Sequence, residues 1–522
     1  MKKFIALLLC VIMVALPFSG CGANTGNDTE ETQAFSVGFA QGDITPPTGV
    51  AISGMGDDDS RFSTGILDPL YATCVAFTDT EGTTVIMFCL DLLNTNVSVC
   101  NTTSTMIAEA TGVPTSNIVF TASHTHSGPT QKMTQFQTVI ESNKKIMDVC
   151  LKLAKDALAD RKPAQMYTTF ARPDGLNYVR HYIMADGTYL GKRLGYVNAN
   201  DIIGHHHKAD NLLQLVKFTR EGGKDVILTN WQAHYQGAPS IDYNGISADY
   251  PGAYRKALEE ALDCHAAFVL GGAGNLVSNS KVPSISNSYD YYEHGKKLAD
   301  AAVAAAANFK PANVGKIYIE ENMYKVPNST GTVPLYAFGF GDFGCAFAPF
   351  EIFDTNAKGV REDSNWKYTF YASCSNGGDS NMYLPDHEGF SFRTYEAYGN
   401  KEEDTVYTRY PEGTAEFIQE ELTTMLNNLF EQSGNEKQER DEGYMSVPFE
   451  PTSDGLEYTN PTPGDISKIT AVENGIYRLQ LMQGLAFRTM LAIDQKTAEE
   501  VMQKQTMKLL FDERGVIVGI AE

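Results

Sequence analysis

The sequence has few basic residues for its length and no basic tract. Its 522 residues contain 41 Lys and Arg against 64 Asp and Glu, which gives a formal net charge of −23. This shortage argues against nucleic acid or an anionic lipid surface as a partner, because both require a basic face. The sequence also lacks internal repeats and heptad runs. Since 43% of the residues are hydrophobic and 11% aromatic, the chain can bury a large core and is not disordered as a whole.

The cysteines lack the spacing of a disulfide framework or of a Cys-rich zinc site. Two of the nine, Cys10 and Cys21, lie in the first 21 residues, and no pair is arranged as C-x-x-C. The scattered remainder are predicted to be small core residues. These are Cys74, Cys89, Cys100, Cys150, Cys264, Cys345 and Cys374.

The N-terminus has the pattern of a secretory signal over residues 1–20. A start containing two lysines precedes an apolar run, Phe4–Phe18, and small residues follow it. Cys21 directly after them predicts a bacterial lipoprotein, acylated at Cys21 and attached to the outside of the membrane. Ordinary signal cleavage and secretion is the alternative, because Phe18 is unusual three residues before such a cysteine. Residues 21–34 are polar and are predicted to form a tether.

Three apolar strands are predicted to run into polar or glycine-rich segments. Residues 117–122 lead to His124, residues 225–230 lead to His234, and residues 266–270 lead to the turn Gly271–Asn275. In open α/β sheets, ligands bind beyond the carboxyl ends of the strands. The pattern therefore predicts a mixed-sheet α/β domain with its site at those ends. Further strands are expected over 72–79, 83–91 and 316–320, and helices over 102–111, 140–160, 289–308 and 415–430.

The histidines carry the chemical signal. His124 and His126 are two residues apart, so in an extended segment both side chains point to the same face. His234 follows another buried strand, and a catalytic zinc takes His and carboxylate ligands with one open position. Glu351, after an apolar segment, is a candidate carboxylate. The residue types favour a metal hydrolase. The alternative interpretation is that His124 and His126 are simply two hydrogen-bonded polar residues at the end of a strand.

Several segments together resemble the neutral/alkaline ceramidase family. The resemblance covers most of residues 38–430, and its motifs occur in the order that the family has. These motifs are Gly42–Pro47 (GDITPP), Leu67–Ala72 (LDPLYA), Cys89–Leu93 (CLDLL), Ser123–Pro129 (SHTHSGP), Asn230–Trp231 before His234, Ser247–Asp249 (SAD) and the Gly271–Asn275 turn.

The resemblance implies a zinc amidase that cleaves the N-acyl bond of ceramide to a fatty acid and a sphingoid base. It implies one zinc ion per chain, with a lipid or other small molecule as substrate. The residues that it assigns are His124, His234, Glu351 and Tyr383 as zinc ligands, Tyr395 as donor to the carbonyl oxygen, and Arg180 and Asn275 as substrate-binding residues. His126, beside the ligands but not one of them, is the candidate general base or proton shuttle. Tyr383 and Tyr395 are chosen because an N-x-Y segment is followed twelve residues later by Y-E.

Departures from the family surround these residues. The family has P-T-S after the second ligand histidine, whereas His234 is followed by Tyr235-Gln236-Gly237. Metal hydrolysis is therefore better supported than ceramide as the substrate. A metallohydrolase acting on another amide or ester stays open, as does a non-catalytic surface lipoprotein that binds a ligand. The oligomeric state is not predicted.

The sequence predicts a catalytic domain over residues 35–430, a charged linker over 431–443 and a small β-rich accessory domain over 444–522. Two further segments attract attention. The run His205-His206-His207 is interpreted as a solvated turn, and Gly56–Ser60 as a solvated acidic loop rather than a cation site.

Overall fold

The computed structural model describes residues 34–445, apart from 56–59, 133, 185–188, 192–198, 235, 284, 286–287, 327–330, 378–382 and 400–407. It also describes the backbone of six strands between residues 456 and 521. The predicted signal peptide, Cys21 and most of the Gly56–Ser60 loop lie outside the described residues. No helix in the described part of the chain is both long and apolar enough to cross a bilayer.

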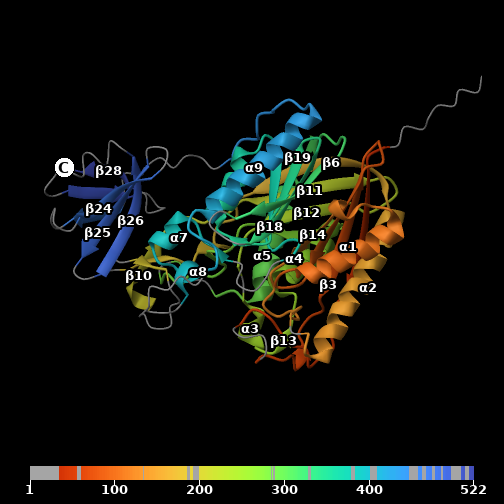
Figure 1. Cartoon of the computed structure of the whole chain (residues 1–522), viewed down its shortest axis with the longest axis horizontal. Helices are drawn as coiled ribbons and strands as arrows, with labels where there is room; N and C mark the ends of the chain where they lie inside the picture. The colour runs from red at the N-terminus through yellow and green to blue at the C-terminus, as the bar shows by residue number, and fades with distance from the viewer. Residues whose placement is uncertain are drawn as a thin grey trace, which may run out of the picture.

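Two sheets stacked face to face form the centre of the region predicted to be the catalytic domain, which we call the catalytic region, and helices cover both outer faces (Figure 1). The larger, nine-stranded sheet has the order β14-β12-β11-β6-β1-β3-β4-β5, with β16 paired to β6. Its strands are β1 (Ser36–Asp43), β3 (Tyr71–Thr78), β4 (Thr84–Leu90), β5 (Ile118–Ala122), β6 (Lys162–Ala171), β11 (Leu213–Arg220), β12 (Val226–Trp231), β14 (His265–Leu270) and β16 (Lys310–Ala312).

The smaller sheet has the order β17-β18-β19-β21. Its strands are β17 (Tyr318–Lys325), β18 (Thr332–Phe340), β19 (Phe343–Phe347) and β21 (Tyr368–Ala372). The helices α1 (Val97–Thr111), α2 (Gln137–Ala159), α4 (Asp249–Leu262) and α5 (Tyr291–Ala306) cover the larger sheet, and α6 (Asp354–Asp363) and α9 (Thr414–Ser433) cover the smaller.

Side-chain alternation explains why the strands are apolar on both faces. In β3, Cys74 and Ala76 belong to the core beneath the helices, whereas Val75 and Phe77 belong to the core between the sheets. A strand buried on both faces reads as a continuous apolar run, because successive side chains point to opposite sides. Aromatic rings such as Phe338 fill the space between the sheets.

The predicted fold class is confirmed: the chain is mixed α/β, with parallel and antiparallel pairs in one sheet. The predicted helices and strands are present, most of them within three residues of the expected ends. The helix expected over 102–111 begins earlier, at Val97, because the Asn96 side chain accepts hydrogen bonds from the amides of Ser98 and Val99.

The two ends of the large sheet are connected by the segment that follows β21. The amide of Asn376 donates to the carbonyl of Phe120 in β5, and the amide of Ser373 donates to the carbonyl of Leu270 in β14. The Asn376 side chain also accepts from the Phe120 amide at 2.7 Å. The carboxyl ends of β5 and β14 therefore open toward the same region, although these strands lie at opposite ends of the strand order.

Shorter elements surround that region. They are β2 (Gly65–Ile66), β7 (Tyr178–Val179), β8 (Tyr182–Met184), β9 (Tyr189–Leu190), β10 (Ile202–His205), α3 (Ala238–Ile241), β13 (Gly245–Ile246), β15 (Leu276–Val277), β20 (Glu351–Ile352), β22 (Tyr383–Leu384), α7 (His387–Ser391) and α8 (Tyr395–Tyr398).

The segment predicted as a linker lies against the catalytic region where it is described. Arg440 donates to the carbonyls of Glu362, Ser364 and Trp366, and the buried Tyr444 bonds to Gln214. Further on, the described strands are β23 (Leu456–Asn460), β24 (Ile466–Val472), β25 (Ile476–Gln483), β26 (Ala486–Asp494), β27 (Met507–Phe511) and β28 (Ile517–Ala521), paired as β23-β27-β28 and β24-β25-β26. The domain boundaries themselves stay a prediction.

Candidate metal centre and active site

His124 is held in a conformation that few residues adopt. It follows β5, and its amide donates to the carbonyl of Leu92. Its φ is 67°, in the left-handed region that is uncommon for any residue except Gly, although Asn, Asp and His occupy it more often than the rest. Its Nδ1 lies 2.7 Å from the carbonyl oxygen of Leu93, to which it donates as an N–H. The Nε2 lone pair is therefore left facing the centre of the site.

His126 is oriented in the same way from the opposite side. Its Nδ1 lies 2.7 Å from the carbonyl oxygen of Gly54, and its own carbonyl accepts a 2.6 Å hydrogen bond from the buried Arg61. Gly54 has φ +105°, and a Cβ there would lie 2.6 Å from His126 Nδ1. Only glycine allows this close approach. His126 Nε2 is thereby placed 3.3 Å from His124 Nε2.

His234, just past the end of β12, completes a buried group of three imidazoles. Its Nε2 lies 2.8 Å from His126 Nε2, and its ring centroid lies 4.6 Å from that of His124. All three histidines are at most 4% exposed. One ring nitrogen from each lies within 4.8 Å of the other two, a spacing that suits a single metal ion.

Glu351 and Tyr383 are brought beside the histidines by a short parallel pair. β20 pairs with β22 so that Glu351 is directly opposite Tyr383. Glu351 Oε2 lies 3.3 Å from His124 Nε2 and 3.9 Å from His234 Nδ1. The glycine-rich turn predicted at 271–275 packs behind this pair, since a Cβ on Gly274 would lie 2.3 Å from the Glu351 carbonyl oxygen.

The donor set fits a bound divalent metal. Two ligands bound to zinc at about 2.0–2.1 Å in a tetrahedral arrangement lie roughly 3.3 Å apart. The separation of His124 Nε2 from Glu351 Oε2, two of the expected ligand atoms, is 3.3 Å. Glu351 Oε2 is buried, and with His124 Nε2 unprotonated it accepts no hydrogen bond from the described residues. Imidazole lone pairs and a carboxylate that face one another need a cation or shared protons between them.

Burial and neighbouring charge set the pKa values of these groups. Burial acts to lower the pKa of His124, but the Glu351 carboxylate and the Cys374 sulfur together outweigh it and raise that pKa well above the usual value. Burial, reinforced by His124, lowers the pKa of His126 well below the usual value. Burial raises the pKa of the Tyr383 phenol.

Arg180 lies between the group of three histidines and a buried carboxylate. Its Nε donates to Glu396 at 2.6 Å, one terminal nitrogen donates to the Gly274 carbonyl at 2.6 Å, and the other lies 3.4 Å from His234 Nδ1. The guanidinium also lies 5.1 Å from the Tyr383 ring centroid and 5.9 Å from that of Tyr395. Arg180 thus lies against His234 as well as facing the cavity.

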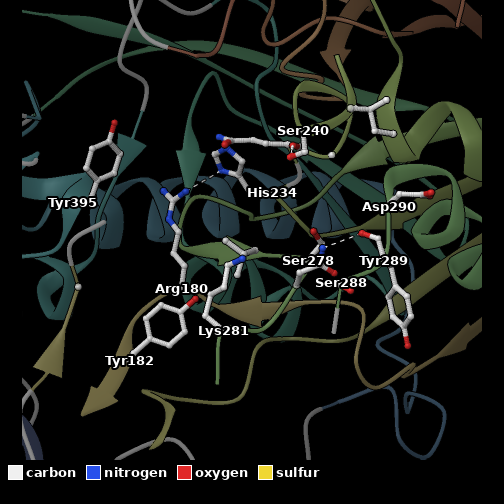
Figure 2. A pocket seen from close by; sticks show the side chains of 16 residues that line it. Arg180, Tyr182, His234, Ser240, Ser278, Lys281, Ser288, Tyr289, Asp290 and Tyr395 are labelled. Atoms are coloured by element: carbon white, nitrogen blue, oxygen red, sulfur yellow. Dashed lines mark hydrogen bonds between the residues drawn. The ribbon is translucent and has the colours of Figure 1, made fainter. Parts of the chain in front are cut away.

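A cavity of about 700 Å³ opens beside these groups, with Arg180, His234 and Tyr395 in its wall. Figure 2 shows Tyr395 and His234 on either side of Arg180, and Lys281, Ser278 and Tyr289 farther along the wall. The cavity therefore places a substrate within reach of the imidazole group.

The structure brings together His124, His126, His234, Glu351, Tyr383, Tyr395 and Arg180. Asn275 is placed elsewhere. Its fully buried side chain donates to Asp354 at 2.7 Å and accepts from the Asp354 amide at 2.9 Å. Both polar atoms are engaged, so Asn275 shapes the turn and does not meet a substrate directly.

The interpretation of the histidine run as a solvated turn is wrong. His206 is 6% exposed, and His205 bonds to the carbonyl of Val179 and to Ser280. Sequence reasoning also missed two supporting residues. Arg61 gave no signal, because an isolated arginine beside an acidic loop looks like a surface residue. Glu396 was visible only as the partner of Tyr395 in the Y-E pair.

Comparisons with known proteins agree on the fold. No family model matches the chain, and no curated protein sequence matches it. The solved neutral ceramidase from Pseudomonas aeruginosa matches 76% of this chain and 75% of its own with a TM-score of 0.59 and 16% identity. A ceramidase structure described as complexed with C2 matches 86% of this chain and 84% of its own, with a TM-score of 0.60 and 14% identity. The chain therefore has a ceramidase-like fold.

Proposed function

We propose that this protein is a zinc-dependent amidase that hydrolyses the N-acyl bond of ceramide or a ceramide-like lipid. The observation that carries the proposal is the buried group of three imidazoles and a carboxylate at the wall of the cavity. The likeness to solved ceramidases supports the choice of an N-acyl lipid as substrate.

The residues that would hold the metal are His124, His234, Glu351 and Tyr383, with His126 beside them. A zinc ion there would polarise the scissile carbonyl and lower the pKa of a water molecule toward about 7. Nitrogen and oxygen donors without thiolate suit zinc and related transition metals.

His126 and Tyr395 are proposed to move and donate protons. His126 uses Nδ1 toward the Gly54 carbonyl, so its Nε2 can accept a proton from the attacking water and pass it to the departing amine. Tyr395 lines the cavity, where its hydroxyl would donate to the carbonyl oxygen as negative charge develops. One such donor contributes about 3–4 kcal/mol to the transition state.

Arg180 is proposed to fix His234 and to contact the substrate. Its contact with Glu396 holds the guanidinium in one position against His234 and the two tyrosine rings. Replacement of Arg180 by lysine should therefore weaken both metal binding and turnover, because lysine lacks the planar fork.

A second candidate is hydrolysis of a more polar amide or ester. The cavity wall carries Lys281, Asp290, Ser240 and Ser278, and a long alkyl chain has no use for these groups. A short or polar acyl donor would use them. Comparing turnover of N-acetyl and long-chain N-acyl substrates of the same amine distinguishes the two candidates.

We also propose that the protein is anchored outside the cell through acylated Cys21. The apolar run and the small residues before that cysteine support this. In cells, Cys21→Ser should abolish incorporation of labelled fatty acid. Equal labelling of the variant and the wild type would contradict the anchor.

The first experiment is metal content together with activity. Wild type, His234→Ala and the nearly isosteric Glu351→Gln would be compared with the control His265→Ala, which changes a half-buried histidine on β14. We expect both site variants to lose metal at this centre and hydrolysis of short-chain ceramide, and the control to retain both. Unchanged metal content in the site variants would refute the metal centre. Retained metal without hydrolysis of any N-acyl substrate would refute the amidase.

His126→Ala separates the proposed proton transfer from metal binding. We expect the metal to remain and the turnover to fall by roughly 10²–10⁴-fold, the usual contribution of general acid–base catalysis. Loss of the metal in this variant would make His126 a ligand instead.

A further inference from the structure

A second group of metal-binding side chains lies outside the centre described above. It consists of His206, His207 and Glu388, and we call it the second histidine cluster. One ligand atom from each lies within 4.8 Å of the other two. His206 and His207 follow β10, and Glu388 lies on α7, so the cluster connects two segments far apart in sequence.

The separations in this cluster fit ligands of one small cation. His207 Nδ1 lies 3.4 Å from His206 Nδ1, and His206 Nδ1 lies 3.9 Å from Glu388 Oε2. Two nitrogens bound to zinc at about 2.0–2.1 Å with tetrahedral angles lie roughly 3.3 Å apart. The two nitrogens therefore already have the spacing of a metal-bound pair, and a small side-chain movement brings the carboxylate to the same range.

His207 is also oriented as metal-binding histidines usually are. Its other ring nitrogen, Nε2, lies 3.4 Å from Asp354 Oδ1. Asp354 is fixed in turn by Asn275 at 2.7 Å and by the amide of Asp210 at 2.9 Å. A carboxylate that holds the far nitrogen selects the tautomer with a free lone pair facing the metal. A solvated turn has no need of this buried support.

We propose that the second histidine cluster binds a second divalent transition-metal ion of the zinc class. His206, His207 and Glu388 would be its ligands, and a water molecule would fill the remaining position. Two imidazoles and one carboxylate favour zinc, cobalt or nickel over magnesium or calcium, which prefer oxygen.

Such an ion would fasten α7 to the segment after β10. α7 lies between Tyr383 and Tyr395, and α8 after it carries Tyr395 and Glu396. The ion would therefore steady the segment that carries one wall of the cavity without touching the substrate. The proposal does not depend on which reaction the first centre performs.

The alternative is an ion pair without metal. If His207 is protonated, it can pair with Asp354 and donate to His206, and the cluster is then satisfied by protons alone. The two arrangements differ in metal stoichiometry, which can be measured directly.

The test is a Zn²⁺ and Co²⁺ titration of the chelator-treated full chain, with bound metal measured by mass spectrometry. We expect two equivalents in the wild type and one in Glu388→Gln and in His206→Gln. The double variant His124→Ala/His234→Ala should retain one equivalent, in the second histidine cluster. The matched control is His387→Gln, the neighbouring residue on α7, whose half-exposed ring pairs with Glu412 and which should leave two equivalents.

Two further measurements distinguish loss of a metal ligand from misfolding of the variant. Asp354→Asn keeps every ligand and should weaken the second equivalent by about 10- to 100-fold. Hydrogen exchange of the α7 amides should slow on addition of Zn²⁺ in the wild type but not in Glu388→Gln. A His124→Ala/His234→Ala double variant that binds no metal would refute the proposal, and so would a Glu388→Gln variant that binds as many equivalents as the wild type.

Discussion

The buried carboxylate of Glu396 allows a quantitative test of how the site is held together. Its side chain is fully buried and contacts Arg180 and His181, with His181 Nε2 at 3.0 Å. Burial by itself would raise the pKa of Glu396, but Arg180 and then His181 outweigh it and lower the pKa to about 2. Replacing Glu396 by glutamine keeps the shape of the side chain and removes this charge.

The lowered pKa of Glu396 sets the size of the expected effect. An ordinary glutamate pKa is about 4.3, and a tenfold change in a proton-binding constant corresponds to about 1.4 kcal/mol. The ionised carboxylate therefore stabilises the folded chain by about 3 kcal/mol at neutral pH. Because the folded pKa is the lower one, this stabilisation is complete above about pH 4.5 and is lost as the pH falls toward 2.

The effect can be measured by urea unfolding followed by tryptophan fluorescence, because both tryptophans lie in this part of the molecule. Trp231 and Trp366 are the only tryptophans in the sequence. Both are fully buried, Trp231 in the core between the larger sheet and its helices and Trp366 in the core between the smaller sheet and its helices. Urea unfolding followed by their fluorescence therefore reports on the catalytic region. Wild type and Glu396→Gln would be compared in chelator from pH 7 down to the lowest pH at which both are folded.

We expect the variant to be less stable by about 3 kcal/mol at pH 7, with the difference shrinking below about pH 4.5. Titrating groups that do not contact Glu396 are the same in both proteins and cancel in the difference. A gap that stays constant with pH, or no gap at neutral pH, would show that the Glu396 charge does not hold Arg180 as the geometry indicates.

Two further predictions concern the support of the metal centre. Arg255→Met removes one partner of the buried Arg255–Asp91 pair, whose 2.7 Å contact lies just before the loop that bonds His124. It should cost about 3–5 kcal/mol in the same fluorescence assay, whereas Lys144→Met, in an exposed helical pair, should change little. Gly274→Ala should weaken metal binding by displacing the Glu351 backbone, and a wild-type metal affinity in that variant would contradict this.

Local pattern was enough to predict most of the fold. Strands such as β3 and β4 were recognisable because nearly every residue in them is buried on one face or the other. The exact helix ends were not, because a cap such as Asn96 acts through its own side-chain hydrogen bonds. The burial of His206 could not be seen either, since nothing in its neighbours along the chain shows that α7 covers it.

The sequence by itself determined which residues are the candidates for the chemistry: two histidines spaced i, i+2, a third after a buried strand, and the carboxylate and tyrosines that the family resemblance pointed out. Only the tertiary structure decided that they meet. The segment after β21 connects β5 to β14, and the pairing of β20 with β22 sets Glu351 opposite Tyr383. Such contacts join residues far apart along the chain, so they depend on strand pairing and core packing, which no local spacing records.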